Sequence, residues 1–446
     1  MTTTTALSES YSTLTQSSYT LRTNLMKQAI VNALILTSCA ISISAQGDSL
    51  QPDPTPTPVR VVVTNTMPPI QPTRTPTPAS SPKPTIIVTS APSQTNSQPS
   101  QASNLNYKGL SFSQMKSKIA EAKRMLQTRP LTTTMSEPMT MNTLVRIAYY
   151  DFRTRNIDFI VLDKETFLTA GVGTMAVSSS GRALTARTIR ANGVNTPIVI
   201  TDETGQPQQP LLIQYPVERG GRFIETAYYI STHPGLVTPE VVSAGRFYVR
   251  NVIDIAREQL RVKGFSIQPK VADIAERLAA VEHVDHFRFR TELHANIYND
   301  IYTLFALNEG QTYRYAVSSA GAGGMVQMIP STYRMVRARF PNALLMPDFV
   351  EGMRNHVNAS QAMLLYMQMT WNDLIASPTV YSAMQDGIAT QEQLMSAGYN
   401  SNPAKLPGYI NRGGANWSTL IPRETKIYLQ IYSSIERAVS QTPRKQ

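Results

Sequence analysis

Residues 308–330 read NEGQTYRYAVSSAGAGGMVQMIP, and this stretch decides how the second half of the chain folds. It opens with a carboxylate, Glu309, continues with a run of small residues at 316–324, and ends with Gln327 and Pro330. Small side chains let a bulky polymer approach the backbone closely, and a proline favours the first turn of a helix. The stretch therefore predicts a cleft that is built around a single acid and is followed by a new helix.

A stripe of apolar residues leads to Glu309. Its members recur at helical spacing and are Leu293, Ile297, Ile301, Leu304 and Phe305. One more turn from Phe305 ends at Glu309, so we expect this carboxyl on the buried face of the helix. Withdrawal from water disfavours the charged form of a carboxyl and raises its pKa. Glu309 is therefore a candidate general acid for glycosidic-bond cleavage, although a solvated residue or an ion-pair partner is the simpler interpretation of a glutamate at a helix end.

Two further segments accompany this stretch, AGYNSNP at residues 397–403 and PRETKIY at residues 422–428. Taken in order, the three segments resemble the catalytic domain of the soluble lytic transglycosylases, which has a lysozyme-like fold. The spacing from Glu309 to Ser318 agrees with the family pattern. The run QTYR at 311–314 departs from it, because the family has a serine and an aromatic-x-Pro after its acid.

The resemblance implies a reaction and a set of site residues. Glu309 would protonate the glycosidic oxygen between N-acetylmuramic acid and N-acetylglucosamine. It would then act as base on the 6-hydroxyl of the muramic acid, which gives a 1,6-anhydro product. The residues that the resemblance places against the substrate are Ser318, Gln327, Tyr399, Asn400 and Glu424. It implies peptidoglycan glycan strands as the partner, and neither a cofactor nor a metal.

Two other functions are compatible with the same residues. A lysozyme-type muramidase, a hydrolase, needs a second carboxylate across the cleft to activate water. Asp348, Asp373 and Asp386 are candidates for that role. A non-catalytic lipoprotein that binds the cell wall needs none of this chemistry, and the presence of Glu309 with Gln327 argues against a decayed site.

One cluster of histidines could bind a metal, with Glu282, His283 and His286 in the order E-H-x-x-H and His294 further on. The order differs from the H-E-x-x-H of helical zinc sites, and a helix would place His283 and His286 only loosely on one face. We therefore expect ordinary histidines and no metal site. The many methionines between residues 325 and 369 are expected to fill the core.

The first 45 residues have the pattern of an export signal. Lys27 precedes an apolar run, AIVNALIL at residues 29–36, which is too short to span a membrane. The LTSC that follows resembles a bacterial lipobox, so Cys39 is predicted to be acylated and to anchor the mature protein to a membrane. The alternative is ordinary signal cleavage after Ala45, and both interpretations predict an extracytoplasmic protein. Cys39 is the only cysteine, which excludes disulfides within the chain.

Composition divides the remaining chain into three parts. Residues 46–104 are rich in proline, threonine and serine and are predicted to form a disordered tether. Residues 105–266 mix helix and strand patterns and are predicted to form an α+β accessory domain without a chemical motif. Residues 267–440 contain helical patterns and are predicted to form an all-α, lysozyme-like catalytic domain. The fold class of the whole chain is therefore α+β.

Local patterns define the elements of the accessory domain. Phe112 opens an amphipathic helix, and Thr238 with Pro239 caps another that should stop at Gly264. The predicted strands are 144–150, 157–162, 197–200, 211–215 and two runs within 217–230. The pair Gly220-Gly221 predicts a hairpin between the last two runs.

Net charge favours an anionic partner without identifying it. The chain has 446 residues, is 41% hydrophobic and carries a formal net charge of +11. Such a balance favours polyanions or acidic surfaces, and cell-wall polymers, anionic lipid and a plain solvated surface all fit it. No basic cluster with interleaved aromatic residues occurs, so nucleic acid is not expected as a partner.

Overall fold

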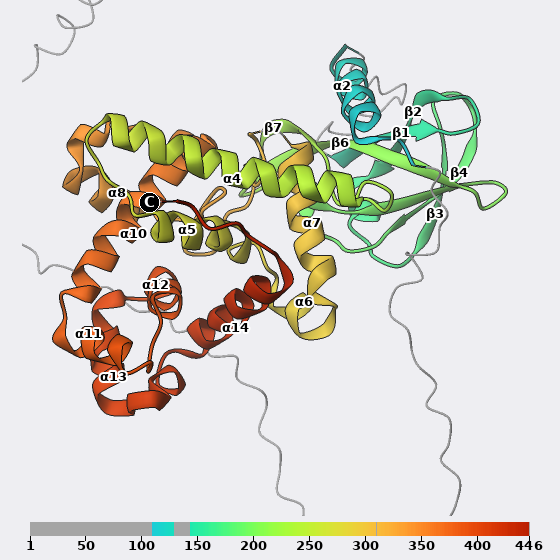
Figure 1. The fold of residues 1–446 in the computed structure, drawn as a ribbon. Helices are drawn as coiled ribbons and strands as arrows, with labels where there is room; N and C mark the ends of the chain where they lie inside the picture. The colour runs from blue at the N-terminus through green and yellow to red at the C-terminus, as the bar shows by residue number, and fades with distance from the viewer. Residues whose placement is uncertain (1–108, 129–142, 309, 446) are drawn as a thin grey trace, which may run out of the picture. The chain divides into compact units, whose positions relative to one another are not determined.

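An antiparallel sheet and a larger set of helices make up the protein in the computed structural model, which describes residues 109–128, 143–308 and 310–445 (Figure 1). These residues belong to one unit of the chain, Gln94–Gln446. The predicted export signal, the predicted tether and Glu309 lie outside the described residues. The mixture of sheet and helices confirms the α+β class.

Seven strands pair antiparallel within the described part of the chain. They are β1 (Leu144–Asp151), β2 (Asn156–Asp163), β3 (Gly173–Val177), β4 (Ala183–Thr188), β5 (Ile198–Asp202), β6 (Pro207–Arg219) and β7 (Arg222–Tyr229). Their order is β2-β1-β6-β5-β4-β3, and β7 also pairs with β6. Gly220 and Gly221 join β6 to β7 with φ angles of 58° and 73°, as a two-residue hairpin requires. The predicted hairpin is therefore confirmed, whereas β3 and β4 have no counterpart among the predicted strands.

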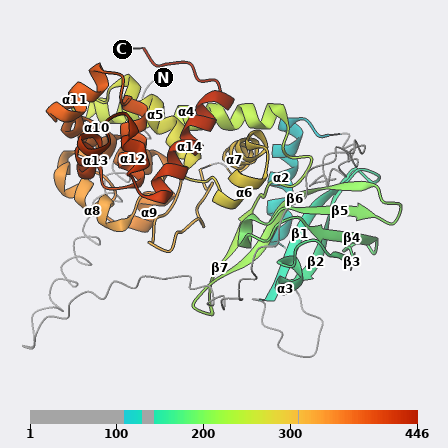
Figure 2. The ribbon, with the colours of Figure 1, turned by 90° about the horizontal axis from the view of Figure 1, so that it is seen from below.

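The sheet curls so that β3 returns toward β2 (Figure 2). The N–H of Ser179, just after β3, donates a 2.9 Å hydrogen bond to the carbonyl of Phe159 in β2. The enclosed face forms one core, whose largest fully buried members are Ile147, Tyr149, Ile160, Phe167, Leu184 and Ile198. Met175 and Val177 of β3 are 71% and 69% exposed. Because both faces of β3 carry apolar residues, its sequence lacks the alternation of apolar and polar residues that marks a half-buried strand.

Helix α2 (Phe112–Thr128) covers the outer face of the sheet, as its apolar period predicts (Figure 1). Its buried residues are Met115, Ile119, Ala122 and Leu126, and they pack on β1, β2 and β6. The carbonyl of Leu126 accepts a 2.7 Å hydrogen bond from the Arg146 side chain in β1. This bond fixes the end of the helix to the sheet.

Helices account for most of the chain after the sheet. They are α4 (Pro239–Val262), α5 (Pro269–Val281), α6 (His286–Thr291), α7 (His294–Leu307), α8 (Pro330–Arg339), α9 (Phe349–Arg354), α10 (His356–Ile375), α11 (Pro378–Gln385), α12 (Gln391–Asn400), α13 (Leu406–Gly413) and α14 (Arg423–Ala438). The short helices are α3 (Lys164–Phe167), η3 (Gly193–Asn195), η4 (Pro341–Ala343), η5 (Pro403–Lys405) and η6 (Gly414–Thr419). Across the three described ranges, we find no helix with both the length and the apolar character of a membrane span.

Helix α4 begins and ends as predicted. Its N-cap is Thr238, whose side chain accepts a backbone N–H of the first turn, and Gly264 follows its end with a φ of 86°. Most of its buried face packs on α5, α7 and α10 (Figure 1). At Gly245 a Cβ atom would lie 1.8 Å from the carbonyl oxygen of Tyr302 in α7, so only glycine permits this crossing. α4 therefore contributes to the helical core, although its sequence lies in the range assigned to the accessory domain.

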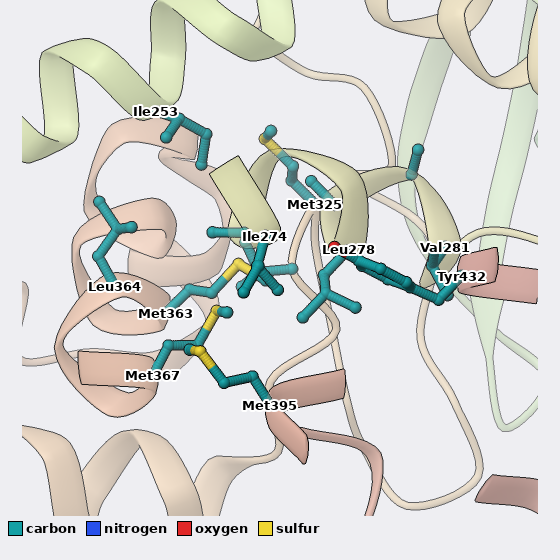
Figure 3. Close-up of a cluster of buried hydrophobic side chains, with 14 of the residues drawn as sticks. Ile253, Ile274, Leu278, Val281, Met325, Met363, Leu364, Met367, Met395 and Tyr432 are labelled. Atoms are coloured by element: carbon teal, nitrogen blue, oxygen red, sulfur yellow. The ribbon is translucent and has the colours of Figure 1, made fainter. Parts of the chain in front are cut away.

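Helix α5 packs on α4, α10, α12 and α14. Its apolar stripe is buried and consists of Val271, Ile274, Leu278 and Val281. Methionines from other segments pack with it in one core, and those labelled in Figure 3 are Met325, Met363, Met367 and Met395. The prediction that methionines fill the core is thus confirmed for Met325, Met363 and Met367, whereas Met335 is 39% exposed.

Helix α7 is shorter than the apolar stripe predicts. Four of the five predicted residues are buried, but Leu293 is the N-cap and is 75% exposed because the backbone there is extended. Including Leu293 in the stripe is therefore wrong. At the other end the helix stops at Leu307, with Asn308 as its C-cap. The helical stripe consequently ends before Glu309.

Candidate active site

A cleft of about 580 Å³ lies among the helices and collects residues from the three segments that the sequence singles out. All five predicted substrate-binding residues line it, namely Ser318, Gln327, Tyr399, Asn400 and Glu424. They come from the loop before α8, from the end of α12 and from the first turn of α14. Segments that are far apart in the sequence therefore form one concave surface.

A carboxyl outside the predicted set, Glu282, completes this cleft. It follows α5 directly and lines the cleft wall. Its Oε1 accepts a 2.5 Å hydrogen bond from the hydroxyl of Tyr428. Burial raises the pKa of Glu282 from 4.5 to about 8, while the bond from Tyr428 lowers it and the charge of Glu424 raises it further. Glu282 is therefore protonated at neutral pH, the state in which a carboxyl donates a proton.

The position of Glu282 follows from the rule that predicts Glu309. Leu278 and Val281 are buried on the apolar face of α5, and Glu282 lies one turn beyond Leu278 on that face. Extending the α5 stripe by one turn therefore identifies the carboxyl. The E-H-x-x-H pattern indicates Glu282 only as a metal ligand beside His283, and so does not identify it as a candidate acid.

Backbone geometry in the small-residue run shapes one side of the cleft. Gln327 has a φ of 46°, and its side-chain amide donates to the carbonyls of Ala316 at 3.2 Å and Gly324 at 2.9 Å. Gly324 has a φ of 71°, and a Cβ atom there would lie 2.5 Å from the carbonyl oxygen of Met353. Glycine is thus required at this position, both for its backbone angle and for its contact with α9.

Two tyrosines form hydrogen bonds in the cleft, Tyr428 to Glu282 and Tyr399 to the loop before α8. The Tyr399 hydroxyl donates a 2.7 Å hydrogen bond to the carbonyl of Val326, and the Tyr366 ring packs edge-on against Tyr399 with centroids 5.9 Å apart. Burial raises the pKa of Tyr399 and of Tyr428 well above the ordinary value, and the Glu282 carboxylate adds to the effect. Both hydroxyls therefore remain neutral donors.

Ser318 lies exposed at the rim of the cleft. Its hydroxyl accepts the N–H of Ala322 at 3.0 Å, and its own N–H donates to the Ala322 carbonyl at 2.9 Å. Gly321, with a φ of 77°, closes this turn. A hydroxyl that accepts a backbone hydrogen bond keeps its own proton for a ligand.

Within the described residues, the carboxylates that line the cleft are Glu282 and Glu424. Glu424 is exposed in the first turn of α14, one turn before Tyr428. The three aspartates considered for water activation do not line this cleft; they are Asp348, Asp373 and Asp386. Glu424 therefore takes their place as the candidate second carboxylate.

Glu309 lies outside the described residues, but its neighbours on both sides are described. Asn308 is buried, and its side chain accepts the N–H of Ile230 at 3.0 Å and donates to the Ile230 carbonyl at 2.9 Å. At Gly310 a Cβ atom would lie 3.9 Å from the Tyr248 hydroxyl. Neither Asn308 nor Gly310 is among the described residues that line the cleft.

Residues 284–312 form an excursion between α5 and the small-residue run. The rings of His283 and Tyr313, which flank the excursion, stack with centroids 3.4 Å apart. The chain therefore returns to the place that it left, after forming α6 and α7. Glu282 and Ser318 line the same cleft although two helices separate them in sequence, so packing and motif spacing indicate different glutamates.

The unusual run QTYR at 311–314 contacts the sheet. The Arg314 guanidinium lies 2.7 Å from the Glu225 carboxylate in β7. The N–H of Tyr313 donates to the hydroxyl of Tyr229, also in β7, at 3.5 Å. These contacts give the departure from the family pattern a structural role at the junction with the sheet.

The histidines of the candidate metal cluster have separate environments. His283 Nε2 lies 2.9 Å from the carbonyl oxygen of Met325, and His294 Nδ1 lies 2.7 Å from the hydroxyl of Ser434. His286 lines the cleft. In the described part of the chain, no group of three or more His, Cys, Asp and Glu side chains is arranged to hold a metal ion.

The arrangement has the parts needed for acid-catalysed cleavage of a polymer. Glu282 is a carboxyl that holds a proton at neutral pH, and Tyr428 is placed to stabilise its charged form. The cleft, of about 580 Å³, surrounds this carboxyl with the five predicted substrate-binding residues. The chain as a whole matches no protein-family model, no curated protein and no solved structure.

Proposed function

We propose that the protein is a peptidoglycan lytic transglycosylase with Glu282 as its general acid and base. The observation that carries this proposal is the position of Glu282 in the cleft that also holds the five predicted substrate-binding residues. Three motifs that resemble one enzyme family thus surround one protonated carboxyl. Helices α5 to α14 would form the lysozyme-like catalytic domain that the resemblance implies.

The proposed reaction uses one carboxyl twice. Protonated Glu282 donates its proton to the oxygen that joins C1 of N-acetylmuramic acid to N-acetylglucosamine, so the C1–O bond breaks and the glucosamine leaves as an alcohol. The carboxylate then takes the proton of the 6-hydroxyl of the same muramic acid, whose oxygen bonds to C1 and closes the 1,6-anhydro ring. The Tyr428 hydroxyl, 2.5 Å from Oε1, stabilises the carboxylate between the two steps.

The other cleft residues have hydrogen-bonding groups that suit a sugar. The two donors of the Gln327 amide face the carbonyls of Ala316 and Gly324, so its Oε1 is the atom that accepts from substrate. Ser318 offers a hydroxyl proton from the rim. Glu424 accepts from sugar hydroxyls at the first turn of α14.

A muramidase is the second candidate function, and Glu424 is the observation that favours it. A hydrolase needs a carboxylate that activates water across the cleft from the acid. Glu424 lines the same cleft as Glu282 and raises its pKa through charge. The two functions differ in product, because hydrolysis leaves a reducing end and transglycosylation leaves an anhydro ring.

Digestion of purified peptidoglycan sacculi, followed by mass spectrometry of the released fragments, tests both functions. Anhydro ends support the transglycosylase, and reducing ends support the muramidase. Glu282→Gln should abolish either product, whereas Glu424→Gln should abolish only the hydrolytic one. If neither the wild-type protein nor Glu282→Gln releases fragments, both proposals fail and the non-catalytic wall-binding protein is supported instead.

We also infer that the protein is extracytoplasmic and anchored through Cys39. This rests on the segment that precedes Cys39, which lies outside the described residues. Cys39→Ser should move the protein from the membrane fraction to the soluble fraction of the cell envelope. Continued membrane association of this variant would contradict the lipid anchor.

A further inference from the structure

A second and larger cavity, of about 990 Å³, lies between the curled sheet and helices α6 and α7. We call it the sheet groove. Its lining includes Tyr215 and Tyr229 of the sheet, Ala191 of the loop before β5, and Phe287 and Arg288 of α6. None of the described residues of the predicted site lines it, and the proposed chemistry does not use it.

The sheet groove and the cleft share one wall, which is the segment that follows α5. The residues of this segment that line the cleft are Glu282, Val284 and His286. Those that line the sheet groove are His283, Asp285 and Phe287. Alternate side chains of one short segment therefore face two cavities, which lie on either side of this segment.

The cations of the sheet groove are paired with acids of the protein. The charged residues that line it are Lys164, Arg190, Arg288, Glu218, Asp285, Glu292 and Asp300. Lys164 lies 2.8 Å from Glu218, and Arg288 lies 2.8 Å from Asp300. Arg190 is paired most weakly, 3.8 Å from Asp300. The four acids outnumber the three cations, so the groove has no positive excess to attract an anion.

Two aromatic rings of the lining are open to solvent. Phe287 is 67% exposed, and Tyr315 is half-buried and meets the buried ring of Tyr229 edge-on with centroids 6.0 Å apart. Exposed aromatic faces in a groove without a net positive charge suit the ring of an uncharged sugar.

We propose that the sheet groove binds uncharged pyranose rings of the glycan strand that continues from the cleft. The inference rests on the proposed function, because that function places a glycan in the cleft. It gives the curled sheet a role, which is to hold the polymer while the cleft cleaves it. A stem peptide carries carboxylates and is disfavoured by the acids of the groove.

The test measures binding of neutral oligomers of β-1,4-linked N-acetylglucosamine to the full chain with Glu282→Gln, which prevents cleavage. A tetramer reports on the cleft alone, and an octamer reaches the groove. Phe287→Ala removes an exposed ring from the groove, and Ala191→Trp fills it from an exposed position. The matched control is Phe247→Ala, since Phe247 and Phe287 are both 67% exposed and Phe247 lines neither cavity.

We expect the octamer to bind about tenfold more tightly than the tetramer, and each groove variant to remove about that gain while tetramer binding stays unchanged. Equal binding of the two oligomers by the parent, or of the octamer by Phe287→Ala and Phe247→Ala, would overturn the inference. Displacement of the octamer by free stem peptide, but not by neutral sugar, would also overturn it.

Sacculus digestion separates the failure of this inference from the failure of the proposed function. Cleavage without groove-dependent binding removes only this inference, and groove-dependent binding without cleavage removes only the enzyme.

Discussion

The ends of α5 and α7 are alike in sequence and differ in what surrounds them. Both helices carry an apolar stripe into the helical core, and a glutamate follows each, Glu282 after α5 and Glu309 after α7. At the end of α5 the chain opens into the cleft, where Tyr428 binds the carboxyl. At the end of α7 the side chain of Asn308 binds the backbone of Ile230, so this helix end is fixed to the sheet.

The difference shows what motif spacing can and cannot identify. Spacing correctly gathers the segments that line one cleft, because each segment is short and locally folded. It does not take account of the excursion at 284–312, which separates Glu282 from Ser318 in sequence while both line the cleft. The proposal of Glu282 therefore rests on packing, whereas the prediction of Glu309 rests on distance along the chain.

The largest expected effect comes from replacing each glutamate in turn. Glu282→Gln should lower the rate of anhydro-fragment release by about a thousandfold, since it removes the proton donor and acceptor. Glu309→Gln should keep the rate within about twofold of the wild type, because the proposed reaction assigns Glu309 no step. The measurement is the initial rate of release from sacculi, with circular dichroism to show that each variant is folded. The reverse outcome, in which only Glu309→Gln is inactive, would return the acid to the position that the motif spacing selects.

Much of the fold follows from local patterns in the sequence. The cap at Thr238, the glycine pair that closes the β6–β7 hairpin and the stripe of α5 all behave as short-range rules predict. The strand β3 does not, because the exposed Met175 and Val177 remove the alternation that marks a half-buried strand.

The candidate site is predicted only in part for a similar reason. The five predicted substrate-binding residues are found by local motifs, and they line one cleft. The α5 stripe places Glu282 on a buried face, but its place in this cleft depends on a long-range contact, the hydrogen bond from Tyr428, 146 residues away along the chain. The sheet groove is formed by β strands and an excursion that have no motif in common, so no local pattern predicts it.

A second prediction compares Gly324, in the run that shapes the cleft, with Gly310, which follows the end of α7. Gly324→Ala should lower the free energy of unfolding by about 3–4 kcal/mol, because its Cβ would lie 2.5 Å from the Met353 carbonyl and its φ is 71°. Gly310→Ala, after α7, should cost about 1 kcal/mol, since its φ of 75° is unfavourable but its nearest neighbour is 3.9 Å away. Urea denaturation of both variants measures the difference. Equal losses would show that the loop at Gly324 relaxes, and that its close approach to α9 does not constrain the cleft.

A third prediction gives the two helix ends opposite effects on stability. Asn308→Ala leaves the buried N–H and carbonyl of Ile230 without partners and should lower the free energy of unfolding by about 2–3 kcal/mol. Glu282→Gln should instead raise it at pH 8 by about 1–3 kcal/mol, because it removes a carboxyl that the folded protein holds in its less favoured environment. Thermal unfolding of the two variants beside the wild type provides the measurement. If Glu282→Gln is as destabilising as Asn308→Ala, the end of α5 is a structural position, as the end of α7 is.

The smallest expected effect is a shift in pH dependence, and it tests why Glu282 is suited to its role. The folded pKa of about 8 exceeds the unfolded value of 4.5, so between these values the folded protein keeps a proton that the unfolded chain has lost. The free energy of unfolding of the wild type relative to Glu282→Gln should therefore fall as pH rises from about 4.5 to 8, and level off above it. Activity should fall as pH rises through about 8, where the acid loses its proton.

Tyr428→Phe removes a hydrogen bond that lowers the pKa of Glu282, so the alkaline limit of activity should move upward by about half a pH unit. Tyr432→Phe, one turn further along α14 and outside the cleft lining, is the matched control and should leave the limit unchanged. A limit that does not move in Tyr428→Phe would mean that another group sets it, and that the hydrogen bond to Glu282 does not control the proton used in the reaction.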